Sequence, residues 1–124
     1  MPKRFVTFKE NCRFKYYSDA LGFMLGHLNK IMSDIPSLPD IMVTSVNDST
    51  HSPHSRHYTD EALDIRLHNF TDALQKHTFL NQLVARLNTD PEAIKPNCFW
   101  GQIENMGTPN EHCHIQVKLG MKYE

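Results

Sequence analysis

Residues 62–67 read ALDIRL, and the alternation of aliphatic and other residues in this stretch predicts the fold around it. Successive side chains of a β-strand point to opposite faces. Ala62, Asp64 and Arg66 would therefore share one face, and the three aliphatic residues between and after them would share the other. The stretch predicts a strand that buries one face in a core and presents charged side chains on the opposite face.

Two amphipathic helices lie on either side of this strand in the sequence. Apolar residues recur at helical spacing over about 18–35, where Ser18 is a suitable first residue and PSLP at 36–39 ends the pattern. A second helical pattern covers about 71–87, and Asn69 is placed to cap it. The residues expected to face inward from the second helix are Leu74, Leu80, Leu83, Val84 and Leu87.

Three further strands are predicted by short β-rich runs: IMVTS at 41–45, CFWGQIEN at 98–105 and HCHIQVKL at 112–119. The turn-rich NMGTPNE joins the last two as an antiparallel hairpin. About sixteen polar residues without periodicity follow IMVTS and are expected to form a long loop. Loops of this length in a compact domain are often functional. The order helix, strand, strand, helix, hairpin predicts an α+β fold, a small single domain over 1–124 with two helices and a mostly antiparallel sheet.

The composition is that of an ordinary globular chain, with 40% apolar and 22% charged residues and a formal net charge of −1. Scattered lysines and arginines give no basic stripe, so we do not expect nucleic acid as a partner. Three cysteines without CxxC spacing do not indicate a disulfide framework. The absence of a long apolar run or an export signal predicts no membrane span and synthesis in the cytoplasm, and we expect a monomer.

Histidines are concentrated in two short stretches, HSPHSRH at 51–57 and EHCH at 111–114, which hold five of the eight in the chain. Imidazole and carboxylate are good zinc ligands, and a catalytic zinc takes three protein ligands and keeps one position open. The spacing would let His57, Asp64 and His114 converge on one ion. A histidine taken alone is more often a surface residue, so the prediction depends on the two clusters meeting in space.

Two neighbours of His114 have chemistry of interest. Glu111 would lie at the start of the last strand, where it could act as general base on a water whose pKa zinc lowers to about 7. His112 shares a face with His114, because strand side chains alternate. It is therefore an alternative ligand or a substrate contact.

The stretch SRHYTDEALDIR, residues 55–66, resembles the SxHxxGxAxD signature of the zinc peptidases of bacterial cell-wall metabolism. This family includes D-Ala-D-Ala carboxypeptidases and dipeptidases and the L-alanyl-D-glutamate endopeptidases of phage endolysins, and it shares its fold with the Hedgehog signalling domain. Ser55, His57, Ala62 and Asp64 match the motif. EHCHIQV supplies the late Glu and His at the family's spacing, and the similarity covers about residues 41–119.

The resemblance implies a Hedgehog/DD-peptidase-like fold and a Zn²⁺ held by His57, Asp64 and His114, with Glu111 as the catalytic base. It implies hydrolysis of peptidoglycan stem peptides, of the D,D-carboxypeptidase or the L-Ala-D-Glu endopeptidase type. Such an enzyme could be encoded by a phage or prophage. It would reach the wall during lysis or be carried in a virion.

Two departures from the family pattern favour an alternative, a catalytically inactive zinc-binding domain with a structural or wall-binding role. Asp60 stands where the family usually has Gly, a position that Asp tolerates if φ is positive. The Arg that usually follows the TS of the first strand is absent from TSVNDS. Arg66, Arg56 or His51 could replace it as the group that stabilises a developing oxyanion.

For Ser55, Arg66 and the histidine pair of HCH, the sequence allows two interpretations each. Ser55 is either a turn hydroxyl or a hydrogen-bond partner that orients a ligand. Arg66 either pairs with Asp64 or meets a substrate carboxylate. The pair in HCH also resembles the metal motif of rolling-circle replication endonucleases, but these need a tyrosine on a later helix, and only Tyr123 follows His114.

Overall fold

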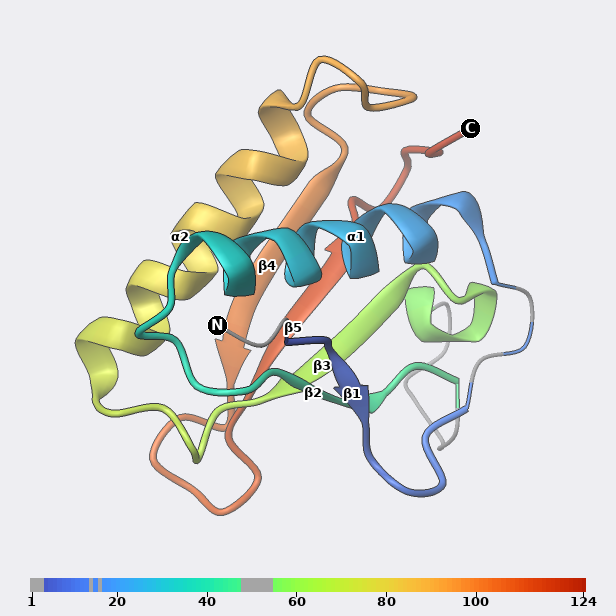
Figure 1. The fold of residues 1–124 in the computed structure, drawn as a ribbon. Coiled ribbons are helices and arrows are strands. Elements are labelled where there is room, and N and C mark those ends of the chain that lie inside the picture. Colours follow the sequence, from blue (N-terminus) through green and yellow to red (C-terminus); the bar gives the residue numbers. More distant parts are fainter. Residues whose placement is uncertain (1–3, 14, 16, 48–54) are drawn as a thin grey trace.

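The computed structural model describes residues 4–13, 15, 17–47 and 55–124, apart from the side chain of Tyr58. In this part of the chain, five strands form one sheet in the order β1-β2-β3-β5-β4, accompanied by two α-helices and a short 3₁₀-helix, η1 (Figure 1). The elements are β1 (Thr7–Phe8), α1 (Asp19–Asp34), β2 (Met42–Ser45), η1 (Arg56–Thr59), β3 (Ala62–Arg66), α2 (Ala73–Thr89), β4 (Phe99–Glu104) and β5 (His112–Val117).

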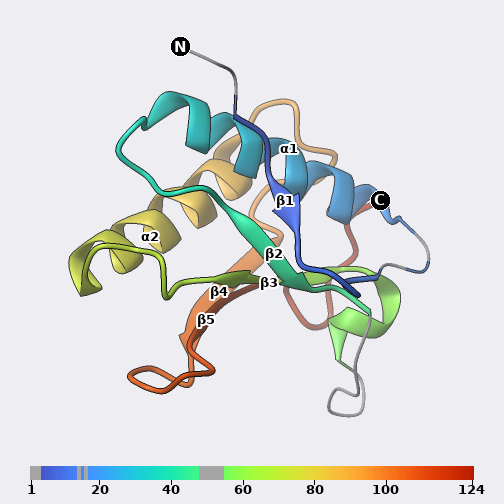
Figure 2. The ribbon, with the colours of Figure 1, turned by 60° about the horizontal axis from the view of Figure 1, so that its bottom comes forward.

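The architecture is the predicted one, an α+β domain with two helices and a mostly antiparallel sheet. Pairs β2–β3, β3–β5 and β5–β4 are antiparallel, while β1 runs parallel to β2 at one edge (Figure 2). The sequence did not predict β1. It is two residues long and is held by backbone hydrogen bonds from Thr7 and Lys9 to the carbonyls of Ile41 and Val43.

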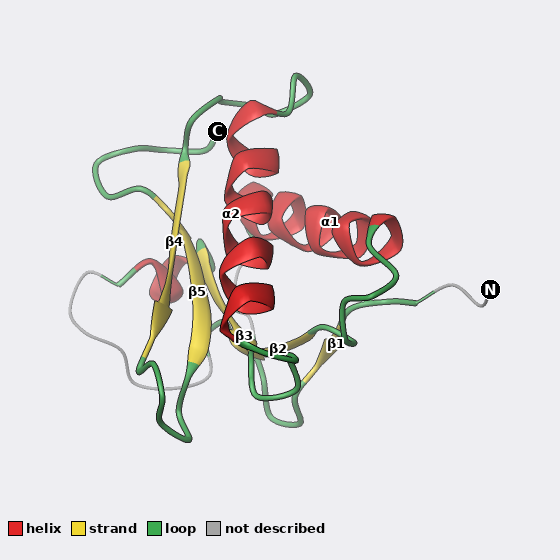
Figure 3. Ribbon diagram, turned by 90° about the vertical axis from the view of Figure 1, so that its left-hand side faces the viewer, coloured by secondary structure: helices red, strands yellow, loops and turns green. Residues whose placement is uncertain are grey.

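Both helices cover the same face of the sheet (Figure 3). The alternation in ALDIRL explains this packing, because Leu63, Ile65 and Leu67 are fully buried in the core. Gly101 of β4 has no side chain at a point where α2 packs on the sheet. A Cβ there would lie 2.5 Å from Cδ1 of Ile115 and 2.9 Å from Cδ1 of Leu80. The opposite face of the sheet carries polar side chains such as Asp64 of β3 and His114 of β5.

The start of α1 is as predicted: Ser18 is the N-cap, and its hydroxyl accepts a hydrogen bond from the Leu21 amide at 3.1 Å. The predicted cap of α2 was wrong. Asp72 caps it, accepting from the Gln75 amide at 2.8 Å, whereas Asn69 donates to the Asp40 carbonyl. The chain makes a further turn after β3 before the helix begins, so the last capping residue before Ala73 takes the role.

Leu74 does not face inward either, because its exposure is 76%. It lies nine residues before Leu83, which is about two and a half helical turns, so the two side chains point in opposite directions. Phe79, which the sequence pattern did not assign to the core, is buried. Neither helix in the described ranges is long and apolar enough to cross a membrane.

Candidate metal centre

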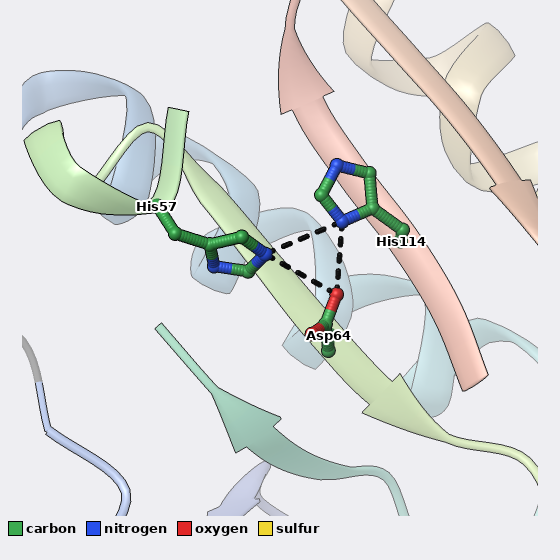
Figure 4. A group of neighbouring side chains, drawn as sticks. All are labelled: His57, Asp64 and His114. Atoms are coloured by element: carbon green, nitrogen blue, oxygen red, sulfur yellow. Dashed lines mark hydrogen bonds and ion pairs between the residues drawn. The ribbon is translucent and has the colours of Figure 1, made fainter. Parts of the chain in front are cut away.

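The candidate centre lies on the sheet face away from α1 and α2. Asp64 of β3 and His114 of β5 are direct cross-strand partners, so their side chains project side by side. His57 comes from η1, which lies over the end of these strands. The three side chains point toward one another (Figure 4).

The distances between their inner atoms match those between the ligands of one ion. Asp64 Oδ1 lies 2.9 Å from His114 Nδ1 and 3.4 Å from His57 Nε2, and the two nitrogens are 3.3 Å apart. Ligands held about 2.0–2.1 Å from a tetrahedral zinc are about 3.3–3.4 Å from one another. Only small side-chain shifts would therefore be needed to bind such an ion. These atoms form one of the groups of side chains able to hold a metal.

Each imidazole has its outer nitrogen engaged by an acceptor. Nδ1 of His57 donates to the Val46 carbonyl at 2.6 Å, and Nε2 of His114 donates to Gln116 Oε1 at 2.8 Å. The amide of Gln116 is oriented by its own donation to the Val117 carbonyl. Neutral imidazoles held in this way present lone pairs at the inner nitrogens, as metal-ligating histidines do.

The electrostatics of the group also favour a cation. His57 and His114 are buried, with exposures of 3% and 7%. Burial would raise the pKa of Asp64, but hydrogen bonds with His114 and His57 outweigh it and hold that pKa well below its usual range. Burial lowers the pKa of His114, but the hydrogen bonds with Asp64 and Gln116 and the negative charges of Asp64 and Glu104 together outweigh it and raise this pKa. The three side chains therefore favour a positive charge between their inner atoms, at the place that a metal ion would occupy.

The segment that carries His57 is fixed by Ser55 and Asp60. The Ser55 hydroxyl accepts from the His57 amide at 3.2 Å and caps η1, so it positions the backbone of the ligand rather than its ring. Asp60 ends η1 in the left-handed conformation, with φ of 56°. The positive φ considered from the sequence is thus present, and Asp is among the residues that adopt it most readily.

The carboxylate of Asp60 also joins separate segments of the chain through hydrogen bonds. It is fully buried and accepts hydrogen bonds from the backbone amides of Lys15 and Tyr17 and from the side-chain amide of Asn47. Ser18 donates to the Asp60 carbonyl at 2.7 Å. A glycine could not make the side-chain bonds. Asp60 thus joins the segment before α1 and the end of β2 to the loop that carries His57.

Glu111, the predicted base, is part of an ion pair. Its Oε1 lies 2.5 Å from Nζ of Lys76 on α2, and its Oε2 accepts from the Gly107 amide at 3.0 Å. The hydrogen bond with Lys76, followed by that with Gly107, lowers the pKa of Glu111. The residue lines the same cleft as the three candidate ligands but is not in either group of side chains able to hold a metal.

The residues considered as replacements for the missing Arg differ in their contacts. Arg56 pairs with Glu61 and donates to the carbonyls of Lys118 and Met121, so its role is structural. Arg66 lines the cleft, and within the described residues it forms no ion pair with Asp64, contrary to the structural pairing considered from the sequence. His51 lies outside the described residues.

Sequence analysis did not single out Glu104 of β4. Its Oε1 lies 2.9 Å from Nε2 of His112, its cross-strand partner, and that nitrogen is 3.6 Å from Asp64 Oδ1. Asp64, Glu104 and His112 form a second group able to hold a metal. The hairpin register contains the signal, because the predicted strand ends at 105 and 112 already place Glu104 near His112.

A cleft of about 1160 Å³ surrounds both groups. Trp100 lies in its wall, half-exposed, with its ring edge-on to that of His114 at a centroid distance of 6.0 Å. Cys113 is buried on the helix-covered face, as its place between two histidines of a strand requires. The cleft is large enough for a short peptide or a small molecule.

Comparisons with known proteins give no family for this chain. No protein-family model matches the sequence, no curated protein matches it, and no solved structure matches the fold.

Proposed function

We propose that this chain is a zinc peptidase that hydrolyses the stem peptides of peptidoglycan, with a domain of the Hedgehog/DD-peptidase type. The observation that carries the proposal is the convergence of His57, Asp64 and His114, with inner atoms 2.9–3.4 Å apart in an open cleft. The spacing of these residues in SRHYTDEALDIR and EHCH resembles that of the cell-wall peptidases. When bound, a zinc ion in such a site polarises a carbonyl group and lowers the pKa of water to about 7.

The chain's own residues would orient the substrate and move its protons. The ion pair with Lys76 keeps the carboxylate of Glu111 ionised, the state that accepts a proton, although it also makes this carboxylate a weaker base. Arg66 lines the cleft and would meet a carboxylate of the stem peptide. Trp100 would form the wall against which the peptide lies.

The experiment is incubation of purified protein with muropeptides, with and without a chelator, followed by liquid chromatography and mass spectrometry. The proposal predicts a new amine whose formation stops on chelation and resumes when zinc is added. The mass of the product identifies the bond, either at the D,D end or between L-Ala and D-Glu. No chelator-sensitive cleavage would contradict the proposal.

A second candidate function is a zinc-binding domain of the same type without activity. The Glu111–Lys76 ion pair and the absence of an Arg after TS favour it. This candidate predicts zinc binding and retention on cell walls without turnover, and no effect of Glu111→Gln on either property.

A further inference from the structure

We propose that Glu104 and His112 hold a second divalent cation, with Asp64 shared between two neighbouring ions. The inference rests on the zinc site of the proposed function, because Asp64 belongs to both groups of side chains. It extends that site across the sheet, from β3 and β5 to the edge strand β4. The chemistry is that of a two-ion centre in which one carboxylate bridges.

The sheet register places the second set of ligands. Glu104 and His112 are direct cross-strand partners on β4 and β5, and they share the face of Asp64 and His114. Nδ1 of His112 donates to the Asn110 carbonyl at 2.7 Å, so the ring is fixed with Nε2 toward the two carboxylates. This is the arrangement already seen at His57 and His114, where a carbonyl group engages the outer nitrogen.

The distances suit an ion beside the first one. His112 Nε2 lies 2.9 Å from Glu104 Oε1 and 3.6 Å from Asp64 Oδ1, and the three ligand atoms lie within 4.8 Å of one another. These values bracket the separation of about 3.3 Å between ligands of a four-coordinate ion. Two ions that share a carboxylate in hydrolytic sites are about 3.5–4 Å apart.

Burial and ligand type distinguish the two positions. The side chains of Glu104 and His112 are 33% and 20% exposed, against 4% for His57 and 9% for His114. The second position offers two carboxylates and one imidazole, a harder set that suits Mn²⁺ as well as Zn²⁺. We therefore expect the second ion to bind more weakly than the first and to leave first on chelation.

A second ion could also supply the positive charge of the Arg that is absent from TSVNDS. The peptidases that this sequence resembles usually have an Arg after the TS, and this chain has none there. A divalent cation with one additional carboxylate, Glu104, adds a net positive charge on the same face of the sheet. Positive charge near a developing oxyanion is what the chemistry requires.

The test is native mass spectrometry and calorimetry of the whole chain, first stripped of metal and then titrated with Zn²⁺. Wild type should take up two ions in two steps, whereas Glu104→Gln and His112→Ala should take up one. Glu111→Gln and His68→Ala are matched controls, since both residues line the cleft outside the two groups, and both should take up two ions. Circular dichroism shows that each variant is folded, and Glu104→Gln preserves side-chain shape if His112→Ala does not fold.

The outcomes separate the two proposals. Uptake of one ion that is lost in His57→Ala but kept in Glu104→Gln would overturn the second position and leave the first in place, with Glu104 and His112 as an ion pair only. Uptake of no ion by wild type would overturn both. Uptake of two ions by Glu104→Gln would show that the second ion binds elsewhere.

Discussion

Glu111 and Lys76 form an ion pair between the start of β5 and α2, with Oε1 and Nζ 2.5 Å apart. The pair joins the helix-covered side of the sheet to the wall of the cleft, because Lys76 belongs to α2 and Glu111 lines the cleft. The pKa of Glu111, the proposed catalytic base, is therefore lowered by a residue that lies 35 positions away in the sequence, on α2.

Replacing Glu111 separates catalysis from metal binding. Glu111→Gln should lower the hydrolysis of stem peptides by about 10²–10⁴-fold, because an amide cannot accept the proton. The zinc content should not change, and loss of a partly exposed ion pair should reduce stability by at most about 1 kcal/mol. Rates on muropeptides and metal analysis measure these effects.

The matched control is Asp34→Asn, which removes the carboxylate of another ion pair, with Arg86, far from the cleft. It should leave both the rate and the zinc content at wild-type values. A wild-type rate in Glu111→Gln would show that another group accepts the proton.

Asp60 should be a strong determinant of stability. Asp60→Ala leaves two backbone amides and the Asn47 amide without this acceptor and places Ala in the left-handed region, so we expect a loss of about 3–5 kcal/mol in the free energy of unfolding. Asp60→Gly should be about 1 kcal/mol better than Ala because Gly adopts positive φ freely. Asp60→Asn, which keeps one acceptor oxygen, should lose least. Denaturant titrations check the order, and Gly equal to wild type would contradict the role of the carboxylate.

The pH dependence follows from competition between zinc and a proton for the same nitrogen. The pKa of His114 is raised above 6.5 in the folded chain, so its stabilisation is full below about pH 6.5 and is lost as pH rises through the folded value. The pKa of Asp64 is lowered from 3.8, so its stabilisation is present above about pH 4 and is lost as pH falls through the folded value. Without metal, the pair therefore stabilises the fold most between about pH 4 and pH 6.5.

Below the raised pKa of His114, zinc has to displace a proton from this side chain. We therefore expect the zinc-induced rise in Tm to grow as pH increases from about 5.5 to about 8, as metal sites with histidine ligands require. Thermal melts with zinc and with chelator across this range measure the difference. His114→Ala serves as control and should show little zinc effect at any pH, whereas a zinc effect in wild type that is largest at pH 5.5 would contradict the site.

Gly101 tests the packing that supports the site. In Gly101→Ala the new methyl group would overlap Ile115 and Leu80, and we expect a loss of about 1–3 kcal/mol. Gly26→Ala is the matched control, because Gly26 is exposed on α1 and a Cβ there would meet nothing within 4 Å beyond its neighbours in the chain and the backbone of its own helix. It should gain about 0.5–1 kcal/mol in stability. Equal effects of the two substitutions in denaturation would contradict the packing.

Much of the fold was predictable because local periodicity and burial agree in this chain. The alternation in ALDIRL and HCHIQV set the faces of β3 and β5, and antiparallel pairing then placed Asp64 beside His114. The sequence could not predict β1, whose two residues have no periodicity and pair only because β2 offers an edge. The sequence also could not predict that Lys76 pairs with Glu111. This contact depends on how α2 packs against the sheet, which no local pattern specifies.

The contacts of Asp60 and Glu104 at the site likewise could not be predicted from local sequence patterns. The residue type at position 60 indicated a tolerated positive φ, but the amides of Lys15, Tyr17 and Asn47 that donate to its carboxylate come from segments distant in the sequence. Glu104 has no motif around it, and only the hairpin register relates it to His112 and Asp64.

The most direct measurement is anomalous diffraction at the zinc edge from crystals of the chain grown with zinc. We expect an anomalous peak about 2.0–2.2 Å from Nε2 of His57, Nδ1 of His114 and a carboxylate oxygen of Asp64. No peak among these atoms at saturating zinc, or an ion held elsewhere while they keep their mutual hydrogen bonds, would contradict it.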